Sequence, residues 1–184
     1  MLHDHISAAQ DTMACRRTLL LRAGVLLCCA VGVASFAQAQ DAKEPTKLQI
    51  RIEVSNGVNP DTSLRPSPIK VRLYELKDVG AFNEADYFSL DTSDKVVLAA
   101  DMLAKDEFIL RPGEVKVLER KSHSQTTAIG VLAGYRDLPN ATWRVVHKLK
   151  EAPEASWYRA FIPANKAELL VSLQPQGITL TEKP

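Results

Sequence analysis

The stretch LQIRIEV, residues 48–54, decides the fold class of this chain. Its apolar side chains occupy every second position, and successive side chains along a β-strand point to opposite faces. One face of this segment therefore packs into a core while the other meets water. The stretch IKVRLYEL, residues 69–76, resumes the same alternation and predicts a second strand.

Further segments of the chain carry strand signals and end at turn residues such as Pro-Gly and Pro-Asn. The segment 127–135 is nearly all apolar and small. Such a composition is typical of a central strand that is covered on both faces. The other predicted strands cover residues 107–110, 115–118, 142–147, 169–173 and 178–181.

A helical insertion is expected inside this series of strands. From Val79 onward the apolar residues recur at spacings of three and four, and Asp78 can cap the start of a short helix. A second helical stretch is expected from Ser93 to Leu103. Because about eight short strands lack the strand–helix–strand rhythm of a parallel sheet, they predict an all-β sandwich. We expect two antiparallel sheets with the helical insertion at about residues 78–103.

The N-terminal segment has the outline of a signal peptide. Arg16 and Arg17 form a positive cluster, and residues 23–37 carry no charge. This uncharged run is shorter than the roughly 20 apolar residues that a membrane-spanning helix needs. Residues 1–39 are therefore expected to direct export of the rest of the chain.

Small residues at Ala37 and Ala39 lie where signal peptidase cuts, which predicts cleavage after Ala39. Residues 40–46 are polar and are expected to form a tether. Residues 47–184 then form the sandwich domain, whether synthesis starts at Met1 or at Met13.

All three cysteines, Cys15, Cys28 and Cys29, lie inside the signal segment. The exported domain therefore has no disulfide and no thiol chemistry. Cys29 is a candidate for lipidation, in which a diacylated cysteine becomes the new N-terminus. Its flank matches a lipobox poorly, because Cys28 occupies the position before it, where a small residue is expected. Acylation at Cys29 and simple cleavage after Ala39 stay open as alternatives.

The charge balance and the scarcity of histidine exclude several classes of function. The whole chain holds 23 Lys and Arg and 22 Asp and Glu, and these become equal once the signal segment is removed. A nucleic-acid-binding protein needs a basic excess, so no nucleic-acid partner is expected. His123, beside Ser122, and His147 are predicted to be a solvated loop residue and a strand residue. We expect no enzyme activity, no metal site and no cofactor.

The loop between the first two strands, residues 55–68, is the most informative feature for function. It is longer than an ordinary hairpin connection, and long loops in small domains are often functional. Its three prolines, Pro60, Pro66 and Pro68, reduce the entropy lost when a partner captures the loop. The alternative is a tolerated surface excursion.

Several short motifs occur in a distinctive order along the chain. They are Asn59-Pro60-Asp61, Arg65-Pro66-Ser67-Pro68, residues 71–77, Phe82, residues 85–90, Asp106-Glu107, residues 111–114, residues 129–137 and Trp143-Arg144. In this order they resemble the TssJ family, the outer-membrane lipoprotein of the bacterial type VI secretion system. The resemblance covers about residues 48–144, and the last 40 residues match only as a strand pattern.

The resemblance implies a transthyretin-like β-sandwich at the periplasmic face of the outer membrane. It also implies binding to the periplasmic domain of TssM, which together with TssL crosses the inner membrane. The loop implicated in TssM contact maps to Asn59, Pro60, Asp61, Arg65, Pro66, Ser67 and Pro68.

Two alternatives accompany this family assignment. Arg65 is the residue expected to grip a carboxylate or carbonyl of the partner, or else it is an internal brace that holds the loop against the sandwich. Trp143 and Arg144 are expected in the core and on the strand surface. A different class of function is a soluble periplasmic carrier, which would need a pocket lined by apolar side chains.

Overall fold

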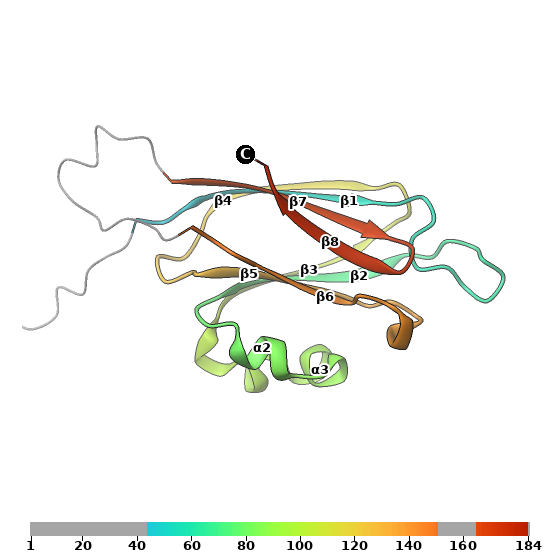
Figure 1. Ribbon diagram of the computed structural model, residues 1–184, viewed down its shortest axis with the longest axis horizontal. Coiled ribbons are helices and arrows are strands. Elements are labelled where there is room, and N and C mark those ends of the chain that lie inside the picture. Colours follow the sequence, from blue (N-terminus) through green and yellow to red (C-terminus); the bar gives the residue numbers. More distant parts are fainter. Residues whose placement is uncertain (1–43, 151–164, 184) are drawn as a thin grey trace, which may run out of the picture. The chain divides into compact units, whose positions relative to one another are not determined.

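Eight strands form two four-stranded sheets that face each other (Figure 1). This computed structural model describes residues 44–150 and 165–183, which belong to the compact unit Asp41–Pro184. The predicted signal peptide, Cys29 and most of the tether lie outside the described residues. In spatial order, the first sheet contains β4 (Val115–Lys121), β1 (Lys47–Val54), β7 (Lys166–Gln174) and β8 (Gly177–Glu182), and the second contains β3 (Met102–Leu110), β2 (Ile69–Leu76), β5 (Ala128–Ala133) and β6 (Arg144–Lys148).

The alternation in β1 directs its apolar side chains into the core, as predicted. Leu48, Ile50 and Ile52 are at most 2% exposed, whereas Lys47 and Arg51 on the other face are exposed. Each fully buried side chain of this kind contributes roughly 1.5–3 kcal/mol. The buried residues of the core between the sheets all belong to the unit Asp41–Pro184.

One pairing corrects the prediction of two purely antiparallel sheets. β1 runs parallel to β7, with Ile50 opposite Leu169, while its other neighbour β4 is antiparallel. Parallel neighbours need a long crossover connection, and here the whole second sheet lies between the two strands in the sequence. The period of two is the same in both kinds of ladder, so the alternation could not distinguish them.

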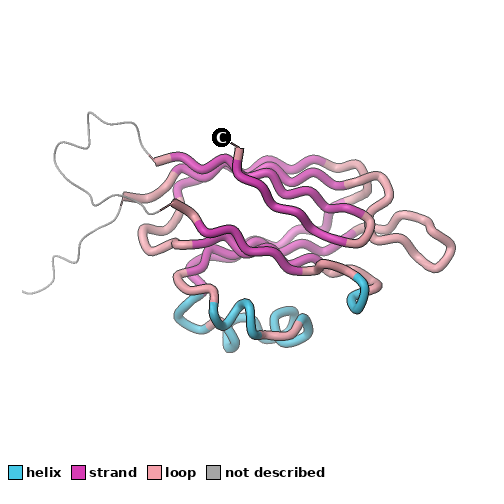
Figure 2. Tube along the Cα trace, in the orientation of Figure 1, coloured by secondary structure: helices cyan, strands magenta, loops and turns pink. Residues whose placement is uncertain are grey.

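β5 is buried at all six positions, as the apolar segment 127–135 predicted. One of its faces lies in the core between the sheets. The other face is covered by α2 (Gly80–Glu84), α3 (Tyr87–Val97) and the short η1 (Ala99–Asp101), which form a helical layer against the second sheet (Figures 1 and 2). A side chain at Gly130 of β5 would place its Cβ 3.0 Å from the Phe82 ring, so this glycine permits the close contact.

The helices begin and end at positions somewhat different from those predicted. Asp86 caps α3, where its carboxylate accepts a hydrogen bond from the Ser89 N–H at 3.0 Å, so α3 begins before the predicted start. A non-helical conformation at Ser93 interrupts α3 at the place where a new helix was expected. The helical layer ends at Asp101 instead of Leu103, because pairing with β2 extends β3 back to Met102.

Buried charges fasten the helical layer to the second sheet. Arg72 of β2 is 8% exposed, and its Nη1 donates to the carbonyl oxygens of Leu90 and Asp91 at 2.9 and 2.8 Å. Its Nε donates to the Glu107 carboxylate. The strand therefore satisfies carbonyl groups of α3 through a single guanidinium group.

Asp94 of α3 completes this attachment from the helical side. Its carboxylate accepts hydrogen bonds from Lys105 Nζ at 2.7 Å and from the Tyr74 hydroxyl at 3.2 Å. Burial and the neighbouring Asp94 charge raise the pKa of Tyr74, so its hydroxyl stays protonated and keeps donating.

Candidate functional site

The loop of residues 55–68 extends beyond the ends of the sheets, between β1 and β2 (Figure 1). Its base is part of the fold. Val58 is fully buried in the core between the sheets, and its carbonyl accepts a hydrogen bond from the Ser67 N–H at 3.2 Å. The two arms of the loop are therefore joined where they leave the sandwich.

Asn59 holds this base with both ends of its side-chain amide. Nδ2 donates to the Pro68 carbonyl at 3.0 Å, and Oδ1 accepts from the Arg136 N–H at 2.8 Å. The residue is 7% exposed and has a φ of 48°, in the left-handed region that asparagine tolerates better than most residues. Asn59 therefore joins the base of the loop to the domain, and its predicted contact with a partner stays a prediction.

Asp61 organises the tip of the loop. Its Oδ1 accepts from the backbone N–H groups of Ser63 and Arg65 at 2.8 and 2.9 Å. Its Oδ2 accepts from Arg65 Nε at 2.9 Å. The backbone and side-chain hydrogen bonds from Arg65 lower the pKa of Asp61, so the tip keeps its charged carboxylate in mild acid.

Arg65 is thus a brace, but within the tip itself and not between the loop and the sandwich. Its Nη2 lies 2.8 Å from Asp61 Oδ2, while its side chain remains 78% exposed. The contact fixes the direction of the guanidinium group and leaves most of its surface to solvent. Pro66 and Pro68 beside it are also exposed.

Leu64 is the residue at this site that the sequence analysis missed. It is 82% exposed, and its φ of 62° is unusual for a branched aliphatic residue. Its N–H donates to the Asp61 carbonyl at 2.8 Å, which holds this conformation. A lone leucine between Ser63 and Arg65 in a polar loop was the signal that could have revealed it.

Ser122 and His123 do not form a catalytic pair. Ser122 is buried, and its Oγ accepts a hydrogen bond from the Thr46 N–H at 3.0 Å. His123 is exposed, and its Nδ1 accepts from the Gln125 N–H at 3.2 Å. No group of three metal-binding side chains occurs among the residues that the structure describes.

Trp143 and Arg144 hold the helical layer and lie apart from the loop tip. Trp143 packs against the core between the sheets and against the apolar side chains under the helical layer. Its ring meets the Tyr87 ring edge to face, with 5.7 Å between the ring centres. Arg144 Nη1 donates to the carbonyls of Phe82 and Ala85, each at 2.7 Å. Trp143 is therefore partly buried at the edge of the core, and Arg144 binds carbonyls at the end of α2.

The fold and the loop define a class of protein: a small β-sandwich with a helical layer on one sheet and an exposed, ordered loop at one end. The family model described as type VI secretion lipoprotein, VasD, EvfM, TssJ matches residues 46–176. The chain belongs to this family of type VI secretion lipoproteins. A search of curated proteins found no match.

Solved structures support the family assignment. The lipoprotein TssJ1 from Pseudomonas aeruginosa is 36% identical, with a TM-score of 0.65, over 76% of this chain and 98% of that one. Lip from Serratia marcescens, a membrane-bound component of the type VI secretion system, is 30% identical, with a TM-score of 0.63, over 76% and 99%. A chain in the structure described as the TssM C-terminal domain from EAEC is 28% identical, with a TM-score of 0.56, over 74% and 99%. Within residues 44–150 and 165–183, no helix is long and apolar enough to cross a membrane.

Proposed function

We propose that this chain is a non-enzymatic structural component of the type VI secretion membrane complex, which binds the periplasmic domain of TssM and is thereby linked to TssL. The observation that carries the proposal is the braced tip of the loop, where Leu64 projects beside Arg65. Arginine is enriched among the residues that dominate binding at interfaces, and the exposed Leu64 beside it offers apolar surface that a partner can bury.

The rigidity of the loop supports this role. Asn59 joins its arms, Asp61 binds the backbone of its tip, and prolines stiffen the arms. Such a loop loses little conformational entropy when a partner captures it. The similarity to chains in structures described as the type VI membrane complex and the TssM C-terminal domain points to the same partner.

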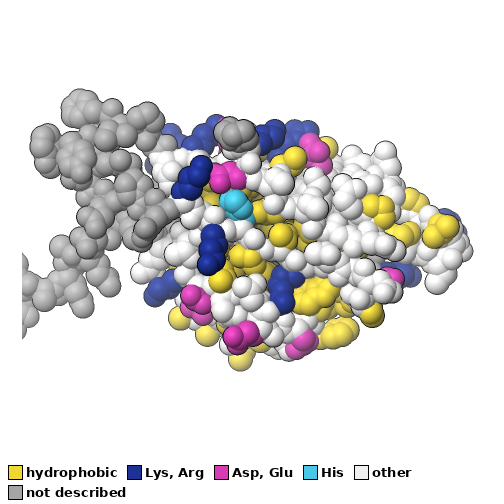
Figure 3. All heavy atoms as spheres, viewed as in Figure 1, with side chains coloured by type: hydrophobic (Ala, Val, Ile, Leu, Met, Phe, Trp, Pro, Cys, Tyr) yellow, Lys and Arg dark blue, Asp and Glu magenta, His cyan; other side chains and the backbone are white. Residues whose placement is uncertain are grey.

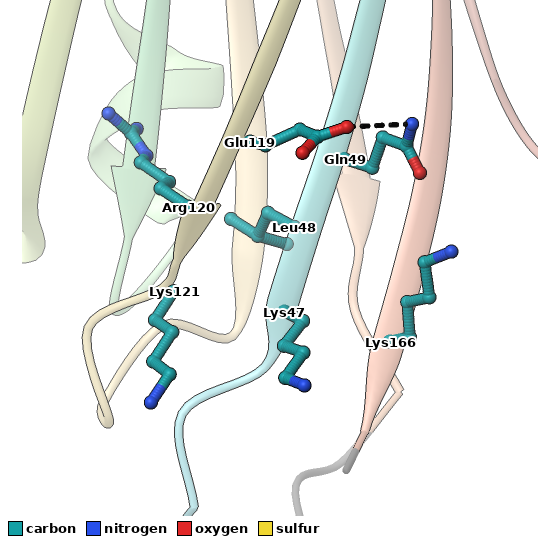
Figure 4. Close-up of a pocket in the computed structure, with 7 residues that line it drawn as sticks. All are labelled: Lys47, Leu48, Gln49, Glu119, Arg120, Lys121 and Lys166. Atoms are coloured by element: carbon teal, nitrogen blue, oxygen red, sulfur yellow. Dashed lines mark hydrogen bonds between the residues drawn. The ribbon is translucent and has the colours of Figure 1, made fainter.

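The carrier function has less support from the described residues. The hollow beside the start of β1 is lined by Lys47, Leu48, Gln49, Glu119, Arg120, Lys121 and Lys166 (Figure 4). A carrier pocket is mainly apolar, whereas charged side chains dominate this one.

The test is co-purification of the unit 41–184 with a periplasmic fragment of TssM. Leu64→Ser should weaken binding about 30-fold, as expected when an interface anchor worth about 2 kcal/mol is removed. Val96→Ser is the matched control, because Val96 is 80% exposed on α3, and the chain after α3 contacts Lys77 at the end of β2 opposite the loop. The free energy of unfolding of both variants should lie within about 0.5 kcal/mol of the wild-type value.

Two outcomes would contradict different parts of the proposal. Wild-type affinity in the double variant Leu64→Ser/Arg65→Ala would refute the loop as the contact surface. Failure of the unaltered domain to bind any periplasmic part of TssM would refute the function.

We also propose that the domain works in the periplasm at the inner face of the outer membrane, in line with the membrane-bound relative. Two forms of the N-terminus remain as candidates, acylated Cys29 and a free end after Ala39. Mass spectrometry of the mature protein distinguishes them, because acyl chains add mass that a simple cleavage product lacks. Cys29→Ser should change the mass and the membrane fractionation only if Cys29 is the acylated residue.

A further inference from the structure

Three lysines form a row across three neighbouring strands of the first sheet. Lys47 of β1 lies opposite Lys121 of β4 on one side and opposite Lys166 of β7 on the other. All three are exposed. Figure 4 shows them at the same end of their strands, around the hollow described above. We call these three residues the lysine row.

The lysine row lies on the outer face of the sandwich. The neighbouring Leu48 is 2% exposed and points into the core, so Lys47 points outward. Like charges directly opposite each other destabilise a sheet. Lys166 contacts Glu168, but Lys47 and Lys121 have no ion pair with any residue within the described ranges. A negatively charged binding partner would relieve this repulsion.

Other lysines lie at the same end of the domain. Lys148 ends β6, opposite the first residue of β5, and Lys183 follows β8. Figure 3 looks at the sandwich from the side of β6 and β8, and in this view lysine and arginine side chains gather mainly over the half where β6 ends and β7 begins. Glu182, a carboxylate at this end, contacts His147 at 3.3 Å and Lys150 at 3.5 Å. Glu119 and Glu168 lie opposite Gln49 in the next row of the same face, and Glu44 precedes β1. These carboxylates and Glu182 offset part of the charge of the six lysines, and a smaller excess of positive charge remains at this end of the sheets.

The polypeptide enters the domain at this same end. Residues 44–46 lead directly into β1, and the loop of residues 55–68 follows the other end of that strand. Eight extended residues separate the two by about 25 Å. Between Cys29 and Lys47 the chain can span at most about 60 Å, so a lipid at Cys29 alone would leave the orientation of the domain open.

We propose that the lysine row binds the phosphate groups of an anionic phospholipid surface and holds this end of the domain against the membrane. Charge complementarity favours this occupant, and the entry of the tether beside the row favours it over an acidic protein segment. Each lysine near such a surface strengthens binding about fivefold. The proposal goes beyond TssM binding and does not depend on it.

The test is flotation of the unit 41–184, without an acyl chain, with lipid vesicles at low ionic strength. Binding is expected to vesicles of phosphatidylglycerol and phosphatidylcholine in equal parts and not to phosphatidylcholine alone, and salt should weaken it. The triple variant Lys47→Gln/Lys121→Gln/Lys166→Gln should lower the affinity about 100-fold. It should remain folded, since it removes a repulsion from the sheet.

The matched control removes three positive charges elsewhere, by Lys95→Gln, Arg111→Gln and Arg136→Gln. This control should bind the anionic vesicles nearly as well as the wild type. An equal loss in both variants would overturn the proposal, because net charge alone would then explain binding. Unchanged vesicle binding in the triple variant, with loss of TssM co-purification, would overturn it in favour of a protein partner.

Discussion

The helical layer and the loop of residues 55–68 are both insertions between strands, but they direct their polar groups in opposite ways. The helical layer directs its polar contacts inward, where Arg72 and Asp94 join α3 to β2 and β3. The loop directs polar side-chain contacts toward the domain at its base, through Asn59. At its tip, Asp61 and Arg65 bind each other and leave Leu64 in solvent.

This difference separates the parts of the molecule that maintain the fold from the part available to a partner. Removing one member of a buried ion pair leaves an uncompensated charge, which is strongly destabilising. An exposed pair contributes little to stability. Substitutions in the helical layer should therefore change unfolding, whereas substitutions at the loop tip should change binding.

The largest effect is expected for Arg72→Ala. It should lower the free energy of unfolding by about 3–5 kcal/mol, because the Asp91 carboxylate loses its ion pair and the carbonyls of Leu90 and Asp91 lose their donor. Urea unfolding followed by circular dichroism measures this change. Arg51→Ala is the control, since Arg51 pairs with Glu53 on an exposed face and should cost at most about 1 kcal/mol. Equal losses in the two variants would contradict the assignment of Arg72 as the main attachment.

A smaller effect is expected at the base of the loop. Asn59→Ala should lower the free energy of unfolding by about 1–3 kcal/mol, because the Pro68 carbonyl and the Arg136 N–H lose their hydrogen-bond partner. Asn59→Gly restores backbone freedom at positive φ but not the amide, so the difference between the two variants measures the conformational part. Both should also weaken the proposed binding to TssM by loosening the loop. Full stability in Asn59→Ala would show that the base does not depend on this side chain.

The smallest effect is expected in acid. Burial raises the pKa of Asp94, but the Lys105 hydrogen bond and charge and the Tyr74 hydroxyl outweigh it, so the pKa lies below the ordinary 3.8. The stability that this carboxylate contributes is complete well above pH 3.8 and is lost as the pH falls through its folded pKa.

Amide exchange of α3 should therefore accelerate below about pH 4, beyond its intrinsic pH dependence, while β1 stays protected. Asp94→Asn should weaken the acid response of α3. An acid response that is the same in α3 and β1 would show that the two layers titrate together.

Much of the fold could be predicted because side-chain period and burial are local properties. The alternation of residues 48–54 and the apolar run at 127–135 report directly which faces are covered. The parallel pairing of β1 with β7 could not be predicted, since both kinds of ladder share one period. Nor could the partners of Arg72, because the carbonyls of Leu90 and Asp91 meet it only after the chain has folded over the sheet.

The candidate site was predicted as a segment but not in its detail. Loop length and prolines identified residues 55–68, and the family motifs pointed to the same place. The roles within the loop depend on hydrogen bonds that composition does not encode. The sequence therefore did not predict that Asn59 joins the base of the loop to the domain or that Leu64 lies exposed at the tip.

The central place of β1 in its sheet has a mechanical consequence. The tether enters at one end of this strand and the loop leaves at the other, so tension between a membrane anchor and a bound partner would pass along a single strand. Its hydrogen bonds to β4 and β7 lie across that direction on both sides, and they would have to shear together. Under such tension the lifetime of the domain depends on its rate of forced unfolding instead of its equilibrium stability.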